Sequence, residues 1–312
     1  MSQVDLSVVV PMYNEQEVID AFFTEVHKVM EKIPKYTYEI VCVNDGSKDN
    51  TLTILKQHAK KDKCIKVLSF SRNFHKEIAV TAGIDFANGN SVIVMDADLQ
   101  HPVELIPEFL KKWEEGYKVV YGVKKQRKAD SFLKRFTANL FYKFYNKITQ
   151  SNMPRNASDY ILFDRQAVDT LKKYREKNRF MRILFYSIGY THCTLEYDVK
   201  ERVAGKTKWN YWKLWNFALD GITSSTTLPL RIWTYLGALI AFISFIYGIY
   251  IISRTLIYGA AVPGYASLLT LILFFGGTQL LVLGIFGEYI GRIFTEVKDR
   301  PLYIIDEKVN LD

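Results

Sequence analysis

This 312-residue sequence has few cysteines and little charge in its last third, and we expect no N-terminal leader. Its three cysteines, Cys42, Cys64 and Cys193, are scattered and lack CxxC spacing, so neither a disulfide framework nor a zinc site is expected. Such usage fits a reducing cytosolic setting. No basic segment precedes the short apolar run from Val4 to Val10, which we interpret as a first strand and not as a signal peptide.

The sequence also has no internal repeat and no low-complexity tract, and its 49% hydrophobic content excludes a disordered protein. Its net charge of +8 leaves nucleic acid, anionic lipid and acidic ligands open as partners. The position of the charges has to decide between them.

Two long stretches near the C-terminus carry no charge. One covers the 22 residues 232–253, and the other runs from Thr255 to Gly287. Each can cross a hydrocarbon core of about 30 Å at about 1.5 Å per residue, although a pair of buried core helices is the alternative. Lysines and arginines flank the two spans, which places both flanks in the cytoplasm and the loop near Pro263 outside. These cations are Lys206, Lys208, Lys213, Arg231, Arg292, Lys298 and Arg300. The basic charge therefore points to a membrane and not to nucleic acid.

The first 125 residues alternate strand-like and helix-like segments, which predicts a mostly parallel α/β sheet with helices on both faces. The expected strands are 6–14, 38–47, 65–71 and 91–98, and the expected helices are 15–33, 49–61 and 77–88. Ligands of such sheets bind beyond the carboxyl ends of the strands. The polar residues found there are Asn14, Glu15, Asp45, Arg72, Asn73, Asp96 and Asp98.

Two amphipathic segments follow this domain. Residues 131–148 mix lysine and arginine with phenylalanine and tyrosine at helical spacing, which is typical of a helix in a membrane interface. A solvated helix packed on the sheet is the alternative. Residues 211–228 carry tryptophans directly before the first span, as an aromatic belt would.

The pair Asp96 and Asp98 follows a buried apolar run, and Gln100 adds a neutral oxygen. Hard oxygen ligands of this kind suit Mg²⁺ or Mn²⁺ with substrate phosphates as further ligands, although helix caps and turns also produce this spacing. A metal on a diphosphate neutralises the charge of a leaving group, so the pattern indicates a reaction that releases a nucleoside diphosphate.

Five ordered motifs carry a resemblance: "VVVPMYNE", "VNDGSKDNT", "FSRNFHKEIAVTAG", "DADLQHPVELIPE" and "ASDYILFDRQAV". Over residues 4–210 the chain resembles the family 2 glycosyltransferases that load polyprenyl phosphates, the GtrB-like bactoprenol glucosyltransferases and dolichol-phosphate mannose synthase. The two spans are similar to those of the GtrB-like branch. The resemblance implies a GT-A nucleotide-sugar fold and an inverting transfer to a lipid phosphate. The chain departs from the usual pattern at His75, Tyr160 and Ile161.

The resemblance also implies roles for single residues. Those expected around the donor nucleotide are Pro11, Tyr13, Asn14, Glu15, Asp45, Lys76 and Asp96, and those expected to hold the metal are Asp96, Asp98 and Gln100. Asp45 has an alternative role as a cap of the following helix. Lys76 and Arg72 are expected to face either the donor phosphates or the acids of the site.

Asp159 and Asp98 are the expected catalytic residues. The exact role of Asp159 stays open, because an acceptor phosphate is largely dianionic at neutral pH and needs no strong base. The cations expected to hold the acceptor phosphate are Lys124, Arg127, Arg135, Arg202 and Lys208, each of which has a surface charge as its alternative.

We therefore predict a GT-A domain over 1–210, a juxtamembrane helix over 211–228, a membrane hairpin over 229–290 and a cytoplasmic tail over 291–312. The expected reaction moves a sugar from UDP-glucose or UDP-N-acetylglucosamine to undecaprenyl phosphate at the cytoplasmic leaflet of the inner membrane. The expected partners are a second copy of the chain, a flippase and a downstream glycosyltransferase. A processive polysaccharide synthase and a catalytically decayed membrane scaffold are the alternatives.

Overall fold

The structure is a computed structural model that describes residues 4–125, 157–177, 179, 181–198, 228–259 and 264–311. The chain divides into two compact units. The first is Met1–Asn210 together with Arg300–Asp312, and the second is Tyr211–Asp299. The expected amphipathic segment 131–148 lies outside the described residues, as do residues 211–227 of the expected segment 211–228.

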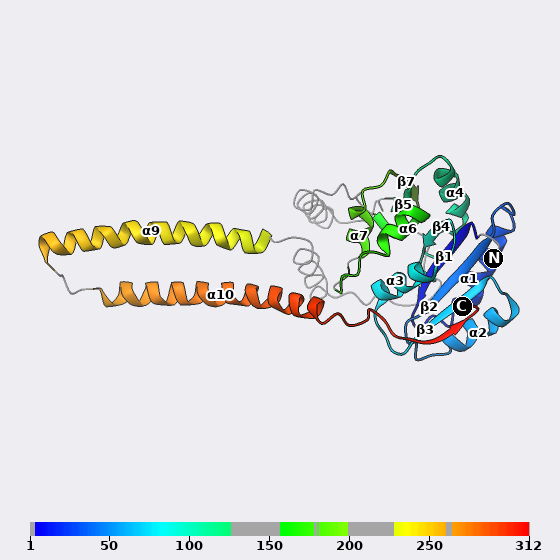
Figure 1. Cartoon of the computed structure of the whole chain (residues 1–312), viewed down its shortest axis with the longest axis horizontal. Coiled ribbons are helices and arrows are strands. Elements are labelled where there is room, and N and C mark those ends of the chain that lie inside the picture. Colours follow the sequence, from blue (N-terminus) through cyan, green and yellow to red (C-terminus); the bar gives the residue numbers. More distant parts are fainter. Residues whose placement is uncertain are drawn as a thin grey trace. The chain divides into compact units, whose positions relative to one another are not determined.

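The first unit is built on one eight-stranded sheet in the order β7-β5-β6-β4-β1-β2-β3-β8 (Figure 1). The four central strands β4, β1, β2 and β3 are parallel to one another, as the sequence predicts. Strand β6 is antiparallel to both β4 and β5, and β7 is parallel to β5. The strands are β1 (Leu6–Met12), β2 (Tyr38–Asn44), β3 (Ile65–Phe70), β4 (Ser91–Val94), β5 (Val119–Lys124), β6 (Ala157–Asp164), β7 (His192–Tyr197) and β8 (Ile305–Val309).

Helices cover both faces of this sheet because its central strands are apolar on both sides. Along β1, Val8 and Val10 pack into one core cluster with α1, α2 and α4. Val9 points the other way and packs into a second cluster with α3, α6 and α7. The helices are α1 (Ile19–Met30), α2 (Thr51–Lys61), α3 (Lys76–Phe86), α4 (Ile106–Glu114), α6 (Arg165–Leu171) and α7 (Met181–Ser187), with a 3₁₀ turn at Val103–Leu105.

The strand order changes direction between β1 and β4. Strands β1, β2 and β3 follow one another to one side, whereas β4 lies on the other side of β1. Crevices at such points are where parallel α/β sheets bind ligands. Strand β1 continues through Pro11, which is opposite Val43 of β2. The pairing of β1 with β4 has already stopped at Val9. The missing N–H of the proline therefore breaks no ladder on the β4 side.

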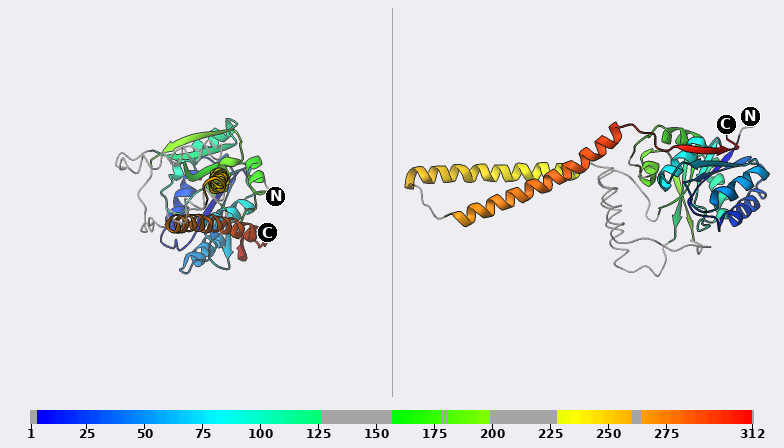
Figure 2. Two further views of the ribbon diagram at one scale, coloured as in Figure 1. Left: turned by 90° about the vertical axis from the view of Figure 1, so that its left-hand side faces the viewer. Right: turned by 90° about the horizontal axis from the view of Figure 1, so that it is seen from below.

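The C-terminal residues differ from the expected tail. Strand β8 pairs antiparallel with β3 and forms the edge of the sheet. Just before it, the ring of Tyr303 stacks on Phe70 with centroids 5.3 Å apart, and its hydroxyl donates to Asp85 Oδ2 at 2.8 Å. Figures 1 and 2 show this last strand, in red, in the same unit as the first strands, in blue. The end of the chain is therefore a structural part of the first unit.

The second unit contains the long helices α9 (Leu228–Tyr258) and α10 (Tyr265–Val297) (Figure 2). Within α9, residues Tyr235–Tyr258 have a mean hydropathy of 2.2, and none of the tested stretch is buried. Among the described residues this is one helix long and apolar enough to cross a membrane. The unit thus offers one of the two expected spans by this criterion.

Candidate active site

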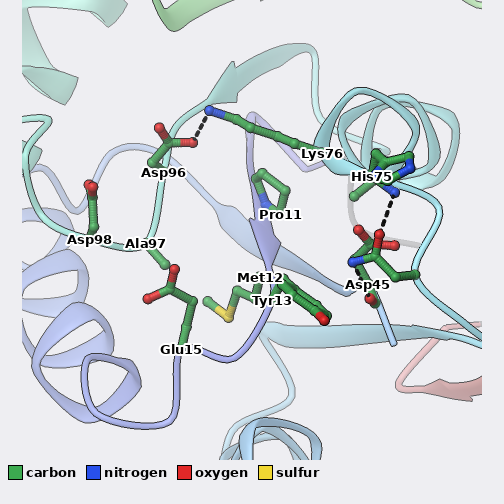
Figure 3. A pocket seen from close by; sticks show the side chains of 12 residues that line it. Pro11, Met12, Tyr13, Glu15, Asp45, His75, Lys76, Asp96, Ala97 and Asp98 are labelled. Atoms are coloured by element: carbon green, nitrogen blue, oxygen red, sulfur yellow. Dashed lines mark hydrogen bonds and ion pairs between the residues drawn. The ribbon is translucent and has the colours of Figure 1, made fainter. Parts of the chain in front are cut away.

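A cavity of about 540 Å³ opens at the carboxyl ends of β1, β2 and β4, at the point where the strand order changes. It is lined by Pro11, Met12, Tyr13, Glu15, Asp45, Asn73, His75, Lys76, Ala79, Asp96, Ala97 and Asp98. Figure 3 shows Asp96, Asp98 and Glu15 on one side of this cavity and Asp45 and His75 on the other, with Pro11 between them. Most of the residues expected at the donor nucleotide therefore meet in one place.

Lys76 joins two carboxylates that come from different strands. Its ammonium lies 2.6 Å from Asp96 Oδ1 and 3.1 Å from Asp159 Oδ2. The sheet brings the two acids together, because Val94 of β4 is opposite Ile161 of the antiparallel β6. Asp96 lies two residues after Val94 and Asp159 two residues before Ile161, so the two acids reach the same level. Of the two partners that the sequence allows for Lys76, the structure thus shows the acids of the site.

The charges of this cluster shift one another's protonation. Burial raises the pKa of Asp96, but the charge and hydrogen bond of the Lys76 ammonium, together with His101, outweigh burial and hold that pKa below its ordinary value. Burial lowers the pKa of Lys76, but the carboxylates of Asp96 and Asp159 outweigh it and hold that pKa well above its ordinary value. Lys76 and Asp96 are therefore both ionised at neutral pH.

The turn after β4 presents the expected metal ligands. Asp96 and Asp98 both line the cavity, whereas Gln100 does not, and its backbone N–H instead donates to Asp98 Oδ1 at 3.1 Å. Within the part of the chain that the structure describes, no group of three or more His, Cys, Asp and Glu side chains could hold a metal ion. Two carboxylates completed by substrate phosphates and water are the donor set that Mg²⁺ uses in nucleotide sites, so Asp96 and Asp98 fit such an ion.

The other end of the cavity is organised by Asp45. Its Oδ1 accepts from the backbone N–H of Phe74 at 2.6 Å, so the carboxylate fastens the loop before α3 and does not cap α2. Burial raises the pKa of Asp45. The neighbouring Gly46 has φ +64°, and a Cβ there would lie 2.6 Å from the backbone nitrogen of Asn73. Only glycine allows these two loops to approach so closely.

The other residues expected near the donor do not all line the cavity. Tyr13 is 41% exposed, and both Tyr13 and Glu15 line the cavity. Asn14 is not among the lining residues. Its Oδ1 accepts from the backbone N–H of Lys48 at 2.8 Å, so it ties the loop after β1 to the loop after β2. The guanidinium of Arg72 lies 4.1 Å from the ring centre of Phe74, outside the cavity lining.

One of the expected acceptor-phosphate cations is described. Lys124 ends β5 and is close enough to contribute to the environment of His101. Arg127, Arg135, Arg202 and Lys208 lie outside the described residues.

His101 is a part of the site that the sequence motifs do not single out. Its Nδ1 accepts from the backbone N–H of Asp96 at 3.3 Å, and its ring stacks on Tyr160 with centroids 5.1 Å apart. Burial lowers the pKa of His101, which keeps the ring neutral and Nδ1 able to accept. The sequence shows His101 within the motif "DADLQHPVELIPE", three residues after Asp98, but the contact itself depends on how the turn folds.

Comparison with known proteins gives this geometry a family. The model of glycosyl transferase family 2 matches residues 7–172, which include every residue that lines the cavity. The chain belongs to glycosyl transferase family 2. The first unit accordingly has a GT-A-like α/β fold with a mostly parallel sheet. A second model, the GtrB C-terminal hairpin, matches residues 228–293.

Relatives match the chain over almost its full length. An uncharacterized glycosyltransferase of Synechocystis sp. is 48% identical over 309 residues, which are 99% of this chain and 97% of the relative. A prophage-derived bactoprenol glucosyl transferase of Shigella flexneri is 48% identical over 300 residues, 96% of this chain and 97% of the relative. An uncharacterized glycosyltransferase of Bacillus subtilis is 42% identical and covers 99% of this chain and 95% of the relative. The resemblance carried by the motifs is confirmed.

The position of Lys76 leads to a prediction about cation binding. In Lys76→Met, Asp96 and Asp159 face each other without a counter-charge, so an added divalent cation no longer competes with the lysine for Asp96. We expect 1 mM MnCl₂ without nucleotide to raise the melting temperature of this variant more than that of the wild type, because a ligand that binds the folded state stabilises it. Thermal unfolding in detergent measures the shift.

The matched control is Lys35→Met, which removes an exposed lysine paired with Glu114 outside the cavity. Its response to Mn²⁺ should equal that of the wild type. Equal responses in all three proteins would contradict the assignment of Asp96 as the cation-binding acid.

Proposed function

We propose that the protein transfers a sugar from a nucleotide diphosphate sugar, UDP-glucose or UDP-N-acetylglucosamine, to undecaprenyl phosphate at the cytoplasmic leaflet of the membrane. The observation that carries this proposal is the full-length likeness to a bactoprenol glucosyl transferase, which extends over both the cavity and the C-terminal hairpin. The carboxylates of Asp96 and Asp98 also support it, since they line the cavity where the strand order changes and are suited to a cation and a diphosphate.

In this proposal one end of the cavity binds the nucleoside of the donor and the other end binds its diphosphate. Asp45, with Tyr13 and Pro11, takes the nucleoside, because a carboxylate accepts from ribose hydroxyls and base N–H groups. Asp96 and Asp98 take the diphosphate end through the metal. Bound there, Mg²⁺ or Mn²⁺ would neutralise the charge that builds on the leaving nucleoside diphosphate.

The transfer itself is a single displacement. An oxygen of the acceptor phosphate forms a bond to the anomeric carbon while the bond from that carbon to the diphosphate breaks, which inverts the configuration. The acceptor is largely dianionic at neutral pH, so it needs no strong base. Asp159, held 3.1 Å from the Lys76 ammonium, then positions sugar or acceptor at the reacting centre, and Lys76 keeps its negative charge in place.

The second unit would anchor this site to the membrane. We propose that α9 and α10 form a two-helix transmembrane hairpin, with interfacial amphipathic segments over 131–148 and 211–228. The match to the GtrB C-terminal hairpin over residues 228–293 supports the pair, and the unburied apolar surface of α9 supports the first span. Both flanks and the catalytic domain, 1–210, then lie in the cytoplasm, where nucleotide sugars are made. A flippase and a further transferase would have to carry the product to a surface glycan, and self-association of the chain stays a prediction.

The transfer is tested by replacing the proposed metal ligands. Asp96→Asn or Asp98→Asn removes charge without removing volume. We therefore expect the rate of sugar transfer to fall at least about 100-fold while the fold is retained. The assay follows sugar from a panel of nucleotide sugars into extracted undecaprenyl phosphate with Mg²⁺ or Mn²⁺. Asp62→Asn, outside the cavity, serves as control. A near wild-type rate in either site variant would contradict the metal assignment, and a wild-type protein inactive with every donor would contradict the function.

Acceptor binding gives a second test with neighbouring lysines. We expect Lys124→Ala to lower kcat/KM for undecaprenyl phosphate about tenfold or more, because a charge-assisted contact to phosphate contributes about 1.5–3 kcal/mol. Lys125 is its matched control, since its exposed ammonium pairs with Asp198 at 3.1 Å and such pairs contribute under about 1 kcal/mol. Titrations in acceptor and in donor measure both variants. A loss of equal size in the two would leave only a diffuse basic surface.

The membrane topology is tested by cysteine labelling in a background without Cys64 and Cys193. A cysteine at Ala261 should react with a membrane-impermeant maleimide added to intact cells, because the charge pattern places that loop outside. A cysteine at the exposed Asp306 should react only after the membrane is permeabilised. The reverse pattern would put the site on the side that lacks nucleotide sugars.

A further inference from the structure

His75 has a backbone conformation that side chains rarely adopt. Its φ is 73° and its ψ is 157°, in a region that is essentially restricted to glycine. Two further non-glycine residues with positive φ, Asn14 and Leu99, lie in the loops after β1 and β4, but their φ of 56° is that of the left-handed helical region, where asparagine in particular is tolerated. His75 is therefore the strained residue of the cavity lining.

The surrounding contacts impose this conformation from both sides. Before His75, the N–H of Phe74 donates to Asp45 at 2.6 Å, and the N–H of His75 itself donates to Asn73 Oδ1 at 3.2 Å. After it, the carbonyl of His75 accepts from Ile78 and Ala79, both at 3.1 Å, in the first turn of α3. The chain thus changes direction within one residue, directly before Lys76.

Glycine would meet this backbone requirement without strain, so the imidazole itself needs an explanation. The ring lines the cavity at the end formed by Asp45 and Tyr13, away from Asp96 and Asp98 (Figure 3). It is exposed, so burial in the core does not account for it. A neutral imidazole both donates and accepts hydrogen bonds and offers a flat face, which suits a nucleobase or ribose.

We infer that His75 binds the nucleoside part of the donor nucleotide. This contact would explain why a residue with a side chain occupies a position whose backbone conformation favours glycine. The inference rests on the proposed function, because it assigns one end of the same cavity to the nucleoside. Asp45 at that end repels phosphate and accepts from sugar and base, whereas the diphosphate belongs with the cation at Asp96 and Asp98.

Two substitutions at the same residue separate strain from ligand contact. His75→Gly removes both the imidazole and the strain, whereas His75→Ala removes the imidazole and keeps a Cβ in the strained conformation. We expect the melting temperature without ligand to rise by about 2–4 °C in His75→Gly only. By isothermal titration with Mn²⁺ present, both variants should bind UDP at least about fivefold more weakly, while inorganic pyrophosphate binds as in the wild type.

The contrary results are equally specific. UDP binding unchanged in His75→Ala would overturn the contact, and pyrophosphate weakened as much as UDP would overturn its assignment to the nucleoside. A His75→Gly protein no more stable than His75→Ala would show that the backbone at this position is not strained. In each of these cases the wild type still binds UDP and transfers sugar, whereas failure of the wild type to do either contradicts the proposed function itself.

Discussion

The ammonium of Lys76, placed between Asp96 and Asp159, is the interaction on which the arrangement of the cavity depends. Carboxylates from β4 and β6 reach the same level of the sheet, and without a cation their repulsion would disfavour that arrangement. The lysine is the first residue of α3, so its position depends on where that helix begins. The start of α3 depends in turn on the loop that Asp45 and Gly46 hold. Two loops and two strands are thus fixed together around one positive charge.

This dependence explains what the sequence alone can and cannot predict. Apolar runs that end in polar residues predict parallel strands, and parallel strands predict that Asp45, Asp96 and Asp98 share one edge. The partner of Lys76 could not be predicted in the same way, because Asp159 lies 83 residues away and meets it through the antiparallel register of β6. Local pattern carries no information on such a register.

Other parts of the site were out of reach for related reasons. The motifs indicate a ligand role for Asn14, but they do not reveal that its amide oxygen joins two loops at a residue with a positive φ. The sequence marks His75 as unusual, but it does not reveal the strained backbone conformation of this residue. That conformation depends on hydrogen bonds made by the residues before and after it. Strand β8 was missed because its three consecutive charged residues, Asp306, Glu307 and Lys308, favour a surface tail as much as an edge strand.

Strand β8 also sets an order of events during biosynthesis. The ribosome makes β3 early and the partner of its outer edge last, after the whole of residues 211–299 has been synthesised. Until then, the outer edge of β3 lacks its native neighbour, and an unpaired edge is where sheets associate wrongly. The nascent domain can therefore complete its sheet only once residues 211–299 have left the ribosome.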